Sequence, residues 1–325
     1  MNSTATIIEI IDMFIADQDV SVSSRKSYRM AVKHFFIWVT NNLTYNKALN
    51  PEVRRITRAM IIQYKRSMEE KNTSSLSIGL YIAVLRKFFA WTESQNIHEN
   101  VAKGIKGPKK YKGYRKDPLS VDQSKALLRS MDRSTLKGKR NYAIMNLLLF
   151  NGLRTIEVTR ANVGDLTFRN GEHVLYLQGK GCTTKDEYSR LEDNVMDALH
   201  AYLLSRESIA DDQPLFASLN SGGRRSADTT LPRSHKGGSL STRTLACMVK
   251  DQLSAIGINS KKITAHSLRH TAGILIIKGG GSIYDVQLFL RHGSTVVTEI
   301  YTRYIEEEMK IENKAGKILA SILND

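Results

Sequence analysis

The chain has 325 residues, and its 48 lysines and arginines outnumber its 32 aspartates and glutamates, which gives a formal net charge of +16 and a sequence pI near 9.7. Hydrophobic residues make up 41% of the chain, which is enough to give about two domains their own cores and excludes global disorder. The apolar runs, such as 147–150, are far shorter than the roughly 18 residues needed to span a bilayer, so we expect no membrane segment. The excess of positive charge favours nucleic acid or an acidic surface as the partner.

The amino terminus and the cysteines indicate the compartment. Residues 1–20 lack the basic region of a signal peptide and carry acidic residues, so an amphipathic helix is expected there. Cys182 and Cys247 lie far apart and form no Cys-x-x-Cys pair, which argues against a disulfide framework or a thiolate metal site. We therefore expect a protein of the reducing cytoplasm.

From residue 1 to about residue 97, apolar side chains recur at helical spacing in four segments. A small all-helical domain with one core is predicted for 1–102. The segments carry Ile7 to Ile15, Tyr28 to Val39, Met60 to Met68 within Thr57–Glu70, and Leu80 to Trp91 within Ser74–Gln95.

A basic segment follows this domain. Residues 103–118 have glycine and proline near both ends and cations between them, with little apolar periodicity, and they are predicted to be an interdomain linker. The segment could be an ordinary solvated hinge, or a strap that crosses a phosphate backbone. Its candidate DNA-binding residues are Lys106, Lys109, Lys110, Lys112, Arg115 and Lys116.

The second domain is predicted for 119–325. Ser120–Gln123 form a capping box, and a helix over Arg140–Phe150 is expected to end where Gly152 can take the left-handed conformation. From Leu166 to Leu191 the apolar period becomes two, with a turn at 179–181, which predicts a β-hairpin or a three-stranded sheet. The fold class is therefore mainly α with a small β-sheet.

The remainder of this domain is predicted to be helical apart from one loop. Residues 218–240 are rich in serine, glycine and arginine and are expected to form a long surface loop. Helices are expected at 193–206, 241–256, 264–278 and 282–290, and after a short stretch to Tyr304 a last amphipathic helix carries Met309, Ile311, Ile318, Leu319 and Ile322.

Candidate phosphate-binding residues lie in the segment 264–271. His266 and Arg269 share one helix face and could hold a phosphate together. His270 stands four residues after His266, as in a zinc pair, but the glutamate of H-E-x-x-H is replaced by Ser267. The sequence has no G-x-x-x-x-G-K-[ST] run, and the acidic run 306–308 is more typical of a solvated face than of a paired-metal site. Phosphate chemistry would therefore use the protein's own cations.

Five motifs in register resemble the tyrosine recombinases, a family that includes phage and transposon integrases, Xer-type resolvases and Cre-like enzymes. The segment 100–109 is also similar to the family's N-P-x-x-G-I-K-x-P-K run, so the resemblance covers nearly the whole chain. The motifs are Gly-Leu-Arg-Thr-Ile-Glu at 152–157, Gly-Lys-Gly at 179–181, Thr-Ala-His-Ser-Leu-Arg-His-Thr at 264–271, His292, and Tyr301 nine residues later.

The resemblance implies a two-domain clamp around duplex DNA and a role for each motif. Tyr301 would attack the DNA and form a 3′-phosphotyrosine, which keeps the bond energy so that neither ATP, a metal nor another cofactor is needed. Arg154 and Arg269 would hold the non-bridging oxygens. A nearby base such as His266 would assist attack, Lys180 would protonate the departing 5′-oxygen, and His292 would donate a hydrogen bond to the phosphate.

Some residues compete with these assignments. Tyr304 lies one helical turn from Tyr301, but the spacing from His292 favours Tyr301. Lys185 competes with Lys180, and the glycines around Lys180 favour the latter. Glu157 matches the family's acid after the first arginine and is interpreted as a buttress of the site.

The sequence departs from the family pattern at two positions. Arg291 replaces the glycine of Leu-Gly-His and adds a cation beside the site, and Arg303 replaces the histidine of Tyr-Thr-His. Neither change removes a catalytic group, but both argue against the housekeeping Xer branch.

We interpret the chain as a nucleoid-associated site-specific recombinase that integrates or excises a mobile element. The alternatives are an Xer-type dimer resolvase, a type IB topoisomerase-like enzyme and a non-catalytic DNA-binding protein with the same fold. The resemblance implies a tetramer on DNA, with the last helix docking on a neighbouring protomer or else closing its own core.

Overall fold

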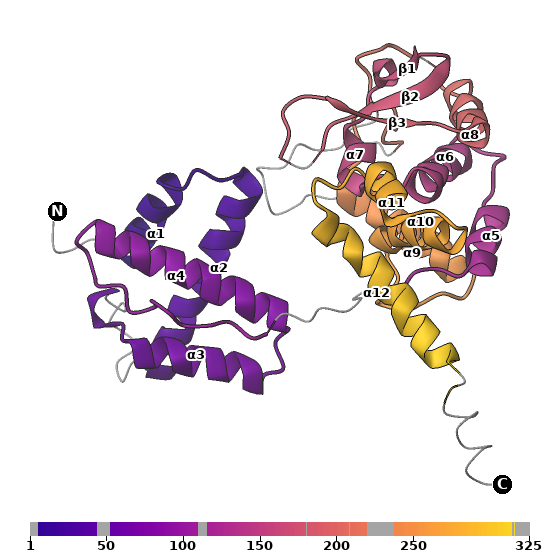
Figure 1. The fold of residues 1–325 in the computed structure, drawn as a ribbon. Coiled ribbons are helices and arrows are strands. Elements are labelled where there is room, and N and C mark those ends of the chain that lie inside the picture. Colours follow the sequence, from indigo (N-terminus) through magenta and orange to yellow (C-terminus); the bar gives the residue numbers. More distant parts are fainter. Residues whose placement is uncertain are drawn as a thin grey trace, which may run out of the picture. The chain divides into compact units, whose positions relative to one another are not determined.

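The computed structural model describes residues 6–43, 53–109, 116–179, 181–207, 209–219, 237–313 and 315. The chain divides into two compact units, Met1–Lys112 and Gly113–Asp325. Helices dominate both units, and the second also contains a three-stranded sheet (Figure 1). The predicted fold class is confirmed. Within the described ranges, no helix is long and apolar enough to cross a membrane.

The first unit is a helical bundle. Helix α2 packs against α1, α3 and α4, and polar residues such as Thr6, Thr57 and Ser74 cap three of the helix starts. Aromatic side chains fill the centre, because apolar residues at helical spacing from each helix face inward. The elements are α1 (Ile7–Ala16), α2 (Val22–Leu43), η1 (Val53–Arg55), α3 (Arg58–Glu70) and α4 (Ser75–Ser94).

The start of the predicted linker belongs to the first unit. Ile105 is 5% exposed and lies in the same apolar cluster as Val101 and Ala102. The backbone of Gly107 approaches Gly79 of α4 so closely that a Cβ atom on Gly107 would lie 3.2 Å from the Gly79 Cα. The basic segment is therefore tethered at one end, because one isoleucine within it finds an apolar site.

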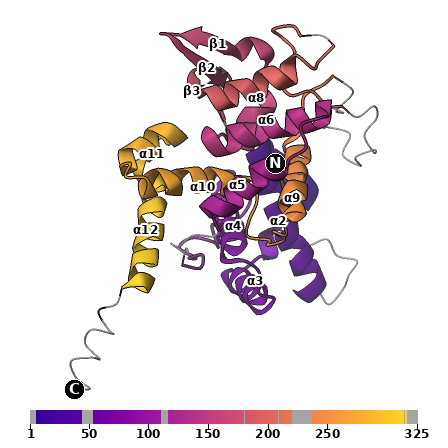
Figure 2. The same cartoon turned by 90° about the vertical axis from the view of Figure 1, so that its right-hand side faces the viewer.

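The second unit surrounds helix α10, which contacts α6, α9, α11 and α12 (Figure 2). Leu268 on α10 is fully buried in the main core, and Leu119 joins that core while its N–H donates to the Thr271 Oγ1 at 2.8 Å. The helices are α5 (Val121–Ser130), α6 (Leu136–Phe150), α7 (Thr155–Arg160), η2 (Val163–Asp165), α8 (Asp193–Leu203), α9 (Thr242–Ala255), α10 (Ala265–Lys278), α11 (Ile283–Leu290) and α12 (Thr295–Glu312).

The sheet is antiparallel in the order β1 (Leu166–Arg169), β2 (Glu172–Leu177), β3 (Glu187–Arg190). Leu166 lies opposite Leu175, and Tyr176 lies opposite Tyr188. Of the two predicted arrangements, the three-stranded sheet is the one observed. Its central strand contacts α7, the short helix that follows Arg154.

Two predictions about the helix ends can be compared directly. Ser120 and Gln123 form the predicted capping box, and Gly152 has φ +54 directly after α6 ends. The prediction of a separate helix after Tyr304 is wrong, because α12 runs without a break through Tyr301 and Tyr304 to Glu312. The apolar positions Ile318, Leu319 and Ile322, and most of the loop 218–240, lie outside the described residues.

Candidate active site

The turn between α6 and α7 positions Arg154. Gly152 is left-handed, and a Cβ atom there would lie 2.6 Å from the Leu290 Cδ2, so the turn needs glycine. Arg154 follows with extended backbone, and its N–H donates to the Glu157 Oε2 at 2.8 Å. Its Nη1 also donates to the Glu157 Oε1 at 2.7 Å, while the side chain stays 33% exposed. Glu157 thus fixes the orientation of the Arg154 side chain, which remains partly accessible to a ligand.

Glu157 is 2% exposed, and its position depends on cationic neighbours. Burial raises the pKa of a carboxyl group, but the charge of Arg291 and the hydrogen bonds from Arg154 outweigh this, so the pKa of Glu157 is lowered. The group is therefore a carboxylate at neutral pH. This geometry agrees with the interpretation of Glu157 as a buttress.

Arg269 is the most deeply placed cation of the site. Its side chain is 2% exposed, and its two terminal nitrogens donate to the carbonyl oxygens of Gly152 and Leu290. Burial and then the charges of Arg154 and Arg291 lower the pKa of Arg269 to about 9, which leaves the guanidinium protonated at neutral pH. Arg269 therefore links the turn before α7 to the end of α11. Its guanidinium has N–H groups beyond these two hydrogen bonds, and they can donate to a ligand.

Tyr301 packs on α10 and is 1% exposed. The contact requires Gly273, because a Cβ atom at that position would lie 2.6 Å from the tyrosine Cε1. The hydroxyl group is hydrogen bonded to the His270 Nδ1 at 3.0 Å. The ring of His292 stacks on Tyr301 with centroids 6.2 Å apart. The candidate nucleophile is thus enclosed between two imidazoles.

The three imidazoles near Tyr301 all favour the neutral form. Burial and then neighbouring positive groups lower the pKa of His270 to about 3 and that of His292 to about 4. His292 Nδ1 is also hydrogen bonded to the Thr298 Oγ1 at 2.9 Å. His266 reaches the surface, but partial desolvation and the charges of Arg269 and Arg154 lower its pKa as well. Neutral imidazoles can accept a proton from a hydroxyl group.

Arg291 ends α11 in the left-handed conformation, with φ 52 and ψ 52. Its Nη2 donates to the Glu157 Oε2 at 3.3 Å, and its Nη1 donates to the Phe289 carbonyl at 2.9 Å. Glu157 therefore lies between two arginines, Arg154 and Arg291. The sequence predicted a cation beside the site here but not this ion pair.

The structure brings five of the six predicted catalytic residues into one neighbourhood of the second unit. The pKa of His292 responds to Arg269, Arg154 and His266, and the Tyr301 ring lies against its imidazole. Lys180, the sixth, lies outside the described residues. Its competitor Lys185 forms an ion pair with Asp165 at 2.5 Å, which occupies that ammonium group.

Two residues that contact Tyr301 were not predicted. His270 was considered only as a zinc ligand, and Gly273 was not considered. The signal for His270 was its position directly after Arg269 on the helix that carries His266. In the described part of the chain, no group of three or more histidine, cysteine, aspartate or glutamate side chains could hold a metal ion.

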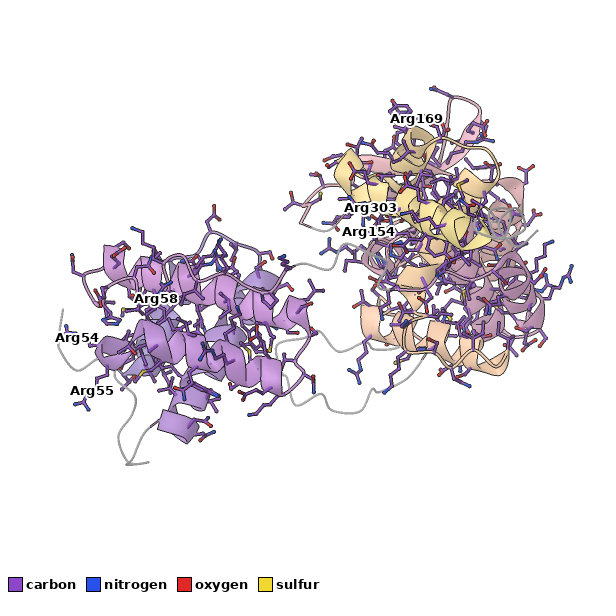
Figure 3. All side chains as sticks on the ribbon, turned by 60° about the horizontal axis from the view of Figure 1, so that its bottom comes forward. Arg54, Arg55, Arg58, Arg154, Arg169 and Arg303 are labelled. Atoms are coloured by element: carbon purple, nitrogen blue, oxygen red, sulfur yellow. The ribbon has the colours of Figure 1, made fainter. Side chains whose placement is uncertain are left out.

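Of the other predicted residues, Lys106 and Lys109 belong to the first unit, and Lys116 belongs to the second, where its charge contributes to the lowered pKa of His266. Lys106 and Lys109 are exposed, and the Lys116 Nζ donates to the Lys261 carbonyl at 3.1 Å. The predicted DNA-binding residues Lys110, Lys112 and Arg115 lie outside the described residues. Arg303 is exposed on α12 and pairs with Glu299 at 3.3 Å. Figure 3 labels Arg303 together with two other arginines of the second unit, Arg154 and Arg169. It also labels three arginines of the first unit, Arg54, Arg55 and Arg58.

The rival tyrosine has a different environment. Tyr304 is part-buried on α12, and burial together with a hydrogen bond to Glu308 raises its pKa to about 12. This acceptor stabilises the protonated phenol, so Tyr304 is a poorer nucleophile at neutral pH. The environment of Tyr304 therefore argues against it as the nucleophile.

Comparison with known proteins identifies the family. Residues 118–308 match the model of the phage integrase family, and residues 11–96 match that of the phage integrase N-terminal SAM-like domain. A tyrosine recombinase of Synechococcus elongatus is 26% identical over 97% of this chain and 94% of its own length. The tyrosine recombinase XerD of Listeria monocytogenes is 26% identical over 94% of this chain and 95% of its own.

Solved structures share the fold. The XerH site-specific recombinase, in a post-cleavage complex with its palindromic difH substrate, superposes with a TM-score of 0.72 at 20% identity, covering 97% of this chain and 86% of that one. A lambda integrase dimer bound to a core site gives a TM-score of 0.66 at 16% identity, covering 91% and 95%. The family model covers more than half of the chain, and the chain belongs to the phage integrase family of tyrosine recombinases.

Proposed function

We propose that this chain cuts and rejoins duplex DNA at specific sites, with the Tyr301 hydroxyl as nucleophile and a 3′-phosphotyrosine as intermediate. The observation that carries the proposal is the position of the Tyr301 hydroxyl, 3.0 Å from the His270 Nδ1, with its ring stacked on His292 and its helix α12 packed on α10, which carries Arg269. A neutral imidazole beside a phenol provides a route for its proton. The 5′-hydroxyl leaves as the phosphotyrosine forms, and the reverse step rejoins a strand.

Arg154 and Arg269 are proposed to bind the non-bridging oxygens of the scissile phosphate. Arg154 is part-exposed and oriented by Glu157, so its guanidinium can reach a ligand without rearrangement. Arg269 keeps N–H groups beyond those that bind the carbonyls of Gly152 and Leu290. Cations fixed before the reaction stabilise the charge that builds on the phosphate in the transition state.

The other roles follow from the family and from placement. His266 is proposed to help remove the Tyr301 proton, and His292 to donate a hydrogen bond to the phosphate. Lys180 is proposed to protonate the leaving 5′-oxygen. Because the phosphotyrosine conserves the energy of the phosphodiester bond, the cycle is proposed to need neither ATP nor a metal ion.

Tyr301 must move before it can react with DNA. A side chain that is 1% exposed cannot reach a phosphate in a duplex. Since Tyr301 lies on α12, and α12 packs on α10 and α11, we infer that DNA binding displaces the tyrosine segment of α12.

The partner is proposed to be duplex DNA, held by both units and by the cationic segment 103–118, in a tetramer on two sites. The relatives XerH and lambda integrase were each solved on DNA. Integration or excision of a mobile element is our preferred role, because Arg291 and Arg303 depart from the housekeeping pattern. The relatives named XerD favour resolution of DNA dimers as the alternative. Recombination tests on plasmids that carry two selected sites, directly or inversely repeated, would separate these roles from site-independent relaxation.

The experiment that tests the nucleophile is covalent trapping. Nicked duplexes, selected for wild-type binding from a pool of randomised sequence, are incubated with wild type, Tyr301→Phe and the matched control Tyr304→Phe in buffer with a chelator. We expect wild type and Tyr304→Phe to form a denaturant-resistant adduct and Tyr301→Phe to form none. If Tyr301→Phe forms an adduct, Tyr301 is not the nucleophile. If wild type forms no adduct, the chain binds DNA without cleaving it.

A further inference from the structure

Arg291 adopts a backbone conformation that is costly for arginine. Its φ of 52 and ψ of 52 lie in the left-handed region, where glycine is at ease and a side chain meets the following carbonyl. The position caps α11, and the Arg291 N–H donates to the Leu288 carbonyl at 3.0 Å. A glycine would make the same turn without strain. An arginine at this position therefore calls for a compensating interaction of its side chain.

The side chain is directed inward rather than toward solvent. It is 8% exposed and donates from Nη2 to the Glu157 Oε2 and from Nη1 to the Phe289 carbonyl. Its Nε is buried without a hydrogen-bond partner in the structure. A buried guanidinium with an unsatisfied N–H is destabilising unless its ion pair is worth more. The Glu157 carboxylate is the anion that it meets.

Glu157 is thereby held at both oxygens by different arginines. Oε1 accepts from the Arg154 guanidinium at 2.7 Å, and Oε2 accepts from the Arg154 backbone at 2.8 Å and from the Arg291 Nη2 at 3.3 Å. Rotation of the carboxylate would break one of these contacts. The orientation of Arg154 is therefore coupled to Arg291 through Glu157.

The charges near the phosphate site change if Arg291 is absent. Three guanidinium groups, Arg154, Arg269 and Arg291, face one carboxylate, so the cluster carries two excess positive charges. Without Arg291, the Glu157 carboxylate would neutralise one of the two remaining positive charges, those of Arg154 and Arg269. A loss of one positive charge by itself would slow cleavage equally with and without Glu157, so a loss that depends on Glu157 separates placement of the carboxylate from net charge.

We propose that Arg291 is a positioning residue that fixes the Glu157 carboxylate, and through it the Arg154 guanidinium, for cleavage. The inference rests on the proposed function, because the orientation of Arg154 matters for cleavage only if Arg154 binds the scissile phosphate. It assigns to this chain a three-membered relay, Arg291 to Glu157 to Arg154, at the position where the family pattern has a glycine. Arg291 itself does not touch the substrate.

The test is a double-mutant cycle on single-turnover cleavage of the selected nicked duplex at saturating enzyme. The variants are Arg291→Gly, Glu157→Gln and the pair. We expect Arg291→Gly, which also relieves the left-handed strain, to fold and to cleave about tenfold more slowly, a loss typical of coupled polar neighbours. In the Glu157→Gln background, removing Arg291 should change the rate by less than about twofold. Arg291→Lys, which keeps the charge, should recover part of the rate.

A pH profile separates positioning from simple loss of structure. The groups that face this carboxylate are Arg154 from the start of α7, Arg291 from the end of α11 and Arg269 from α10, while Glu187 of β3 faces Arg291. Loss of Arg291 leaves burial less opposed, so the pKa of Glu157 rises. The acid limb of the cleavage rate should therefore move to higher pH in Arg291→Gly and stay in place in Asn170→Gly, a control at another left-handed residue with φ 50.

The outcomes separate this inference from the proposed function. No wild-type adduct would overturn both. A wild-type adduct combined with an unchanged rate for Arg291→Gly would overturn the relay alone. Equal fold losses for Arg291→Gly in the wild-type and Glu157→Gln backgrounds would also overturn it, because Arg291 would then act independently of Glu157.

Discussion

The two units bury different kinds of side chain. Among the described residues of the first unit, the buried set is apolar and aromatic except for Thr92. The second unit buries the charged residues Arg140, Glu157 and Arg269 as well as a large apolar core. Two of these three belong to the candidate site. Charged groups are kept inside a protein only with partners, so their presence marks the unit in which chemistry is expected.

This difference indicates how each unit tolerates change. An apolar core loses stability in proportion to the contacts and volume removed, and its function follows its folding. When one member of a network of buried charges is removed, its partners are left without a hydrogen-bond or ion-pair partner. The loss then falls on the placement and charge of the remaining groups. Substitutions in the first unit should therefore alter stability and binding, whereas those around Tyr301 should alter the reaction itself.

The largest effect is expected from Phe88→Ala in the first unit. Phe88 is fully buried and meets the rings of Phe14 at 5.3 Å and Phe36 at 5.9 Å. Its truncation should lower the free energy of unfolding by about 3–5 kcal/mol, since a large cavity remains. Both tryptophans, Trp38 and Trp91, lie in this unit, so urea unfolding followed by tryptophan fluorescence reports on it.

The same variant tests whether the units are separable. At saturating DNA and low temperature, the folded fraction of Phe88→Ala should cleave at the wild-type rate. A cleavage rate per folded molecule that falls tenfold would contradict the separation. A loss of stability below about 1 kcal/mol would show instead that the aromatic core can close the cavity.

An intermediate effect is expected from Gly273→Ala in the second unit. The added methyl group would lie 2.6 Å from the Tyr301 Cε1, so either α12 moves away or the ring is displaced. We expect about 1–3 kcal/mol of destabilisation, as for other overpacked cores. Far-UV circular dichroism should show an earlier transition while the tryptophan signal is unchanged. Gly79→Ala on α4 is the matched control, because a Cβ atom added to Gly79 would have nothing within 4 Å.

The sequence predicted much of the fold because periodicity and caps are local properties. The sheet between Leu166 and Leu191, the capping box at Ser120 and the stop at Gly152 all depend on residues close in the chain. The break expected near Tyr304 was wrong because the packing of α12 on α10 is not local. Ile105 was assigned to the linker for the same reason: its burial depends on a distant helix.

The candidate site was predicted as a set of motifs rather than as a geometry. Motif order placed Arg154, His266, Arg269, His292 and Tyr301 in one site, and the structure brings them together. It did not indicate that Tyr301 is enclosed, since this depends on Gly273 and His270 across two helices. The ion pair of Arg291 with Glu157 joins residues 134 positions apart, and a pairing at that separation leaves no local pattern.

A smaller effect should appear in the pH dependence of stability. The pKa values of His270 and His292 are lowered to about 3 and about 4 in the folded state, whereas an unfolded histidine titrates near 6.5. Between these limits the unfolded chain binds more protons, so stability falls as the pH falls from about 6.5 toward 4. Because carboxyl groups titrate mainly below this window, the histidines dominate between pH 7 and pH 5.

The test compares urea unfolding at pH 7 and pH 5 by far-UV circular dichroism, which reports on the helices of both units, and by tryptophan fluorescence, which reports on the first unit alone. Wild type should lose stability on acidification, and His270→Gln should lose less, because one buried imidazole has been removed. The tryptophan transition of the first unit serves as the internal reference. Equal losses in wild type and His270→Gln would mean that His270 is not held neutral by its surroundings.

The smallest effects on the reaction are expected from the exposed lysines at the end of the first unit. Lys106 and Lys109 extend from a segment whose Ile105 is buried and whose Lys103 carbonyl accepts a hydrogen bond from Arg58 at 2.5 Å. A tethered cation loses less freedom when it meets a phosphate than one on a free strand does. If each lysine contacts one phosphate, each substitution by alanine should reduce the slope of log K against log[salt] by about 0.9.

Lys125→Ala on α5 removes an equal charge at an exposed position and distinguishes a placed contact from net charge. Net charge alone would make all three alanine variants equivalent. Contacts by the linker predict a reduced slope for Lys106→Ala and Lys109→Ala only, with cleavage at saturating DNA unchanged. An unchanged slope in both linker variants would remove Lys106 and Lys109 from the DNA interface. The positive charge would then attract DNA through other exposed cations, such as Arg54, Arg55 and Arg58 (Figure 3).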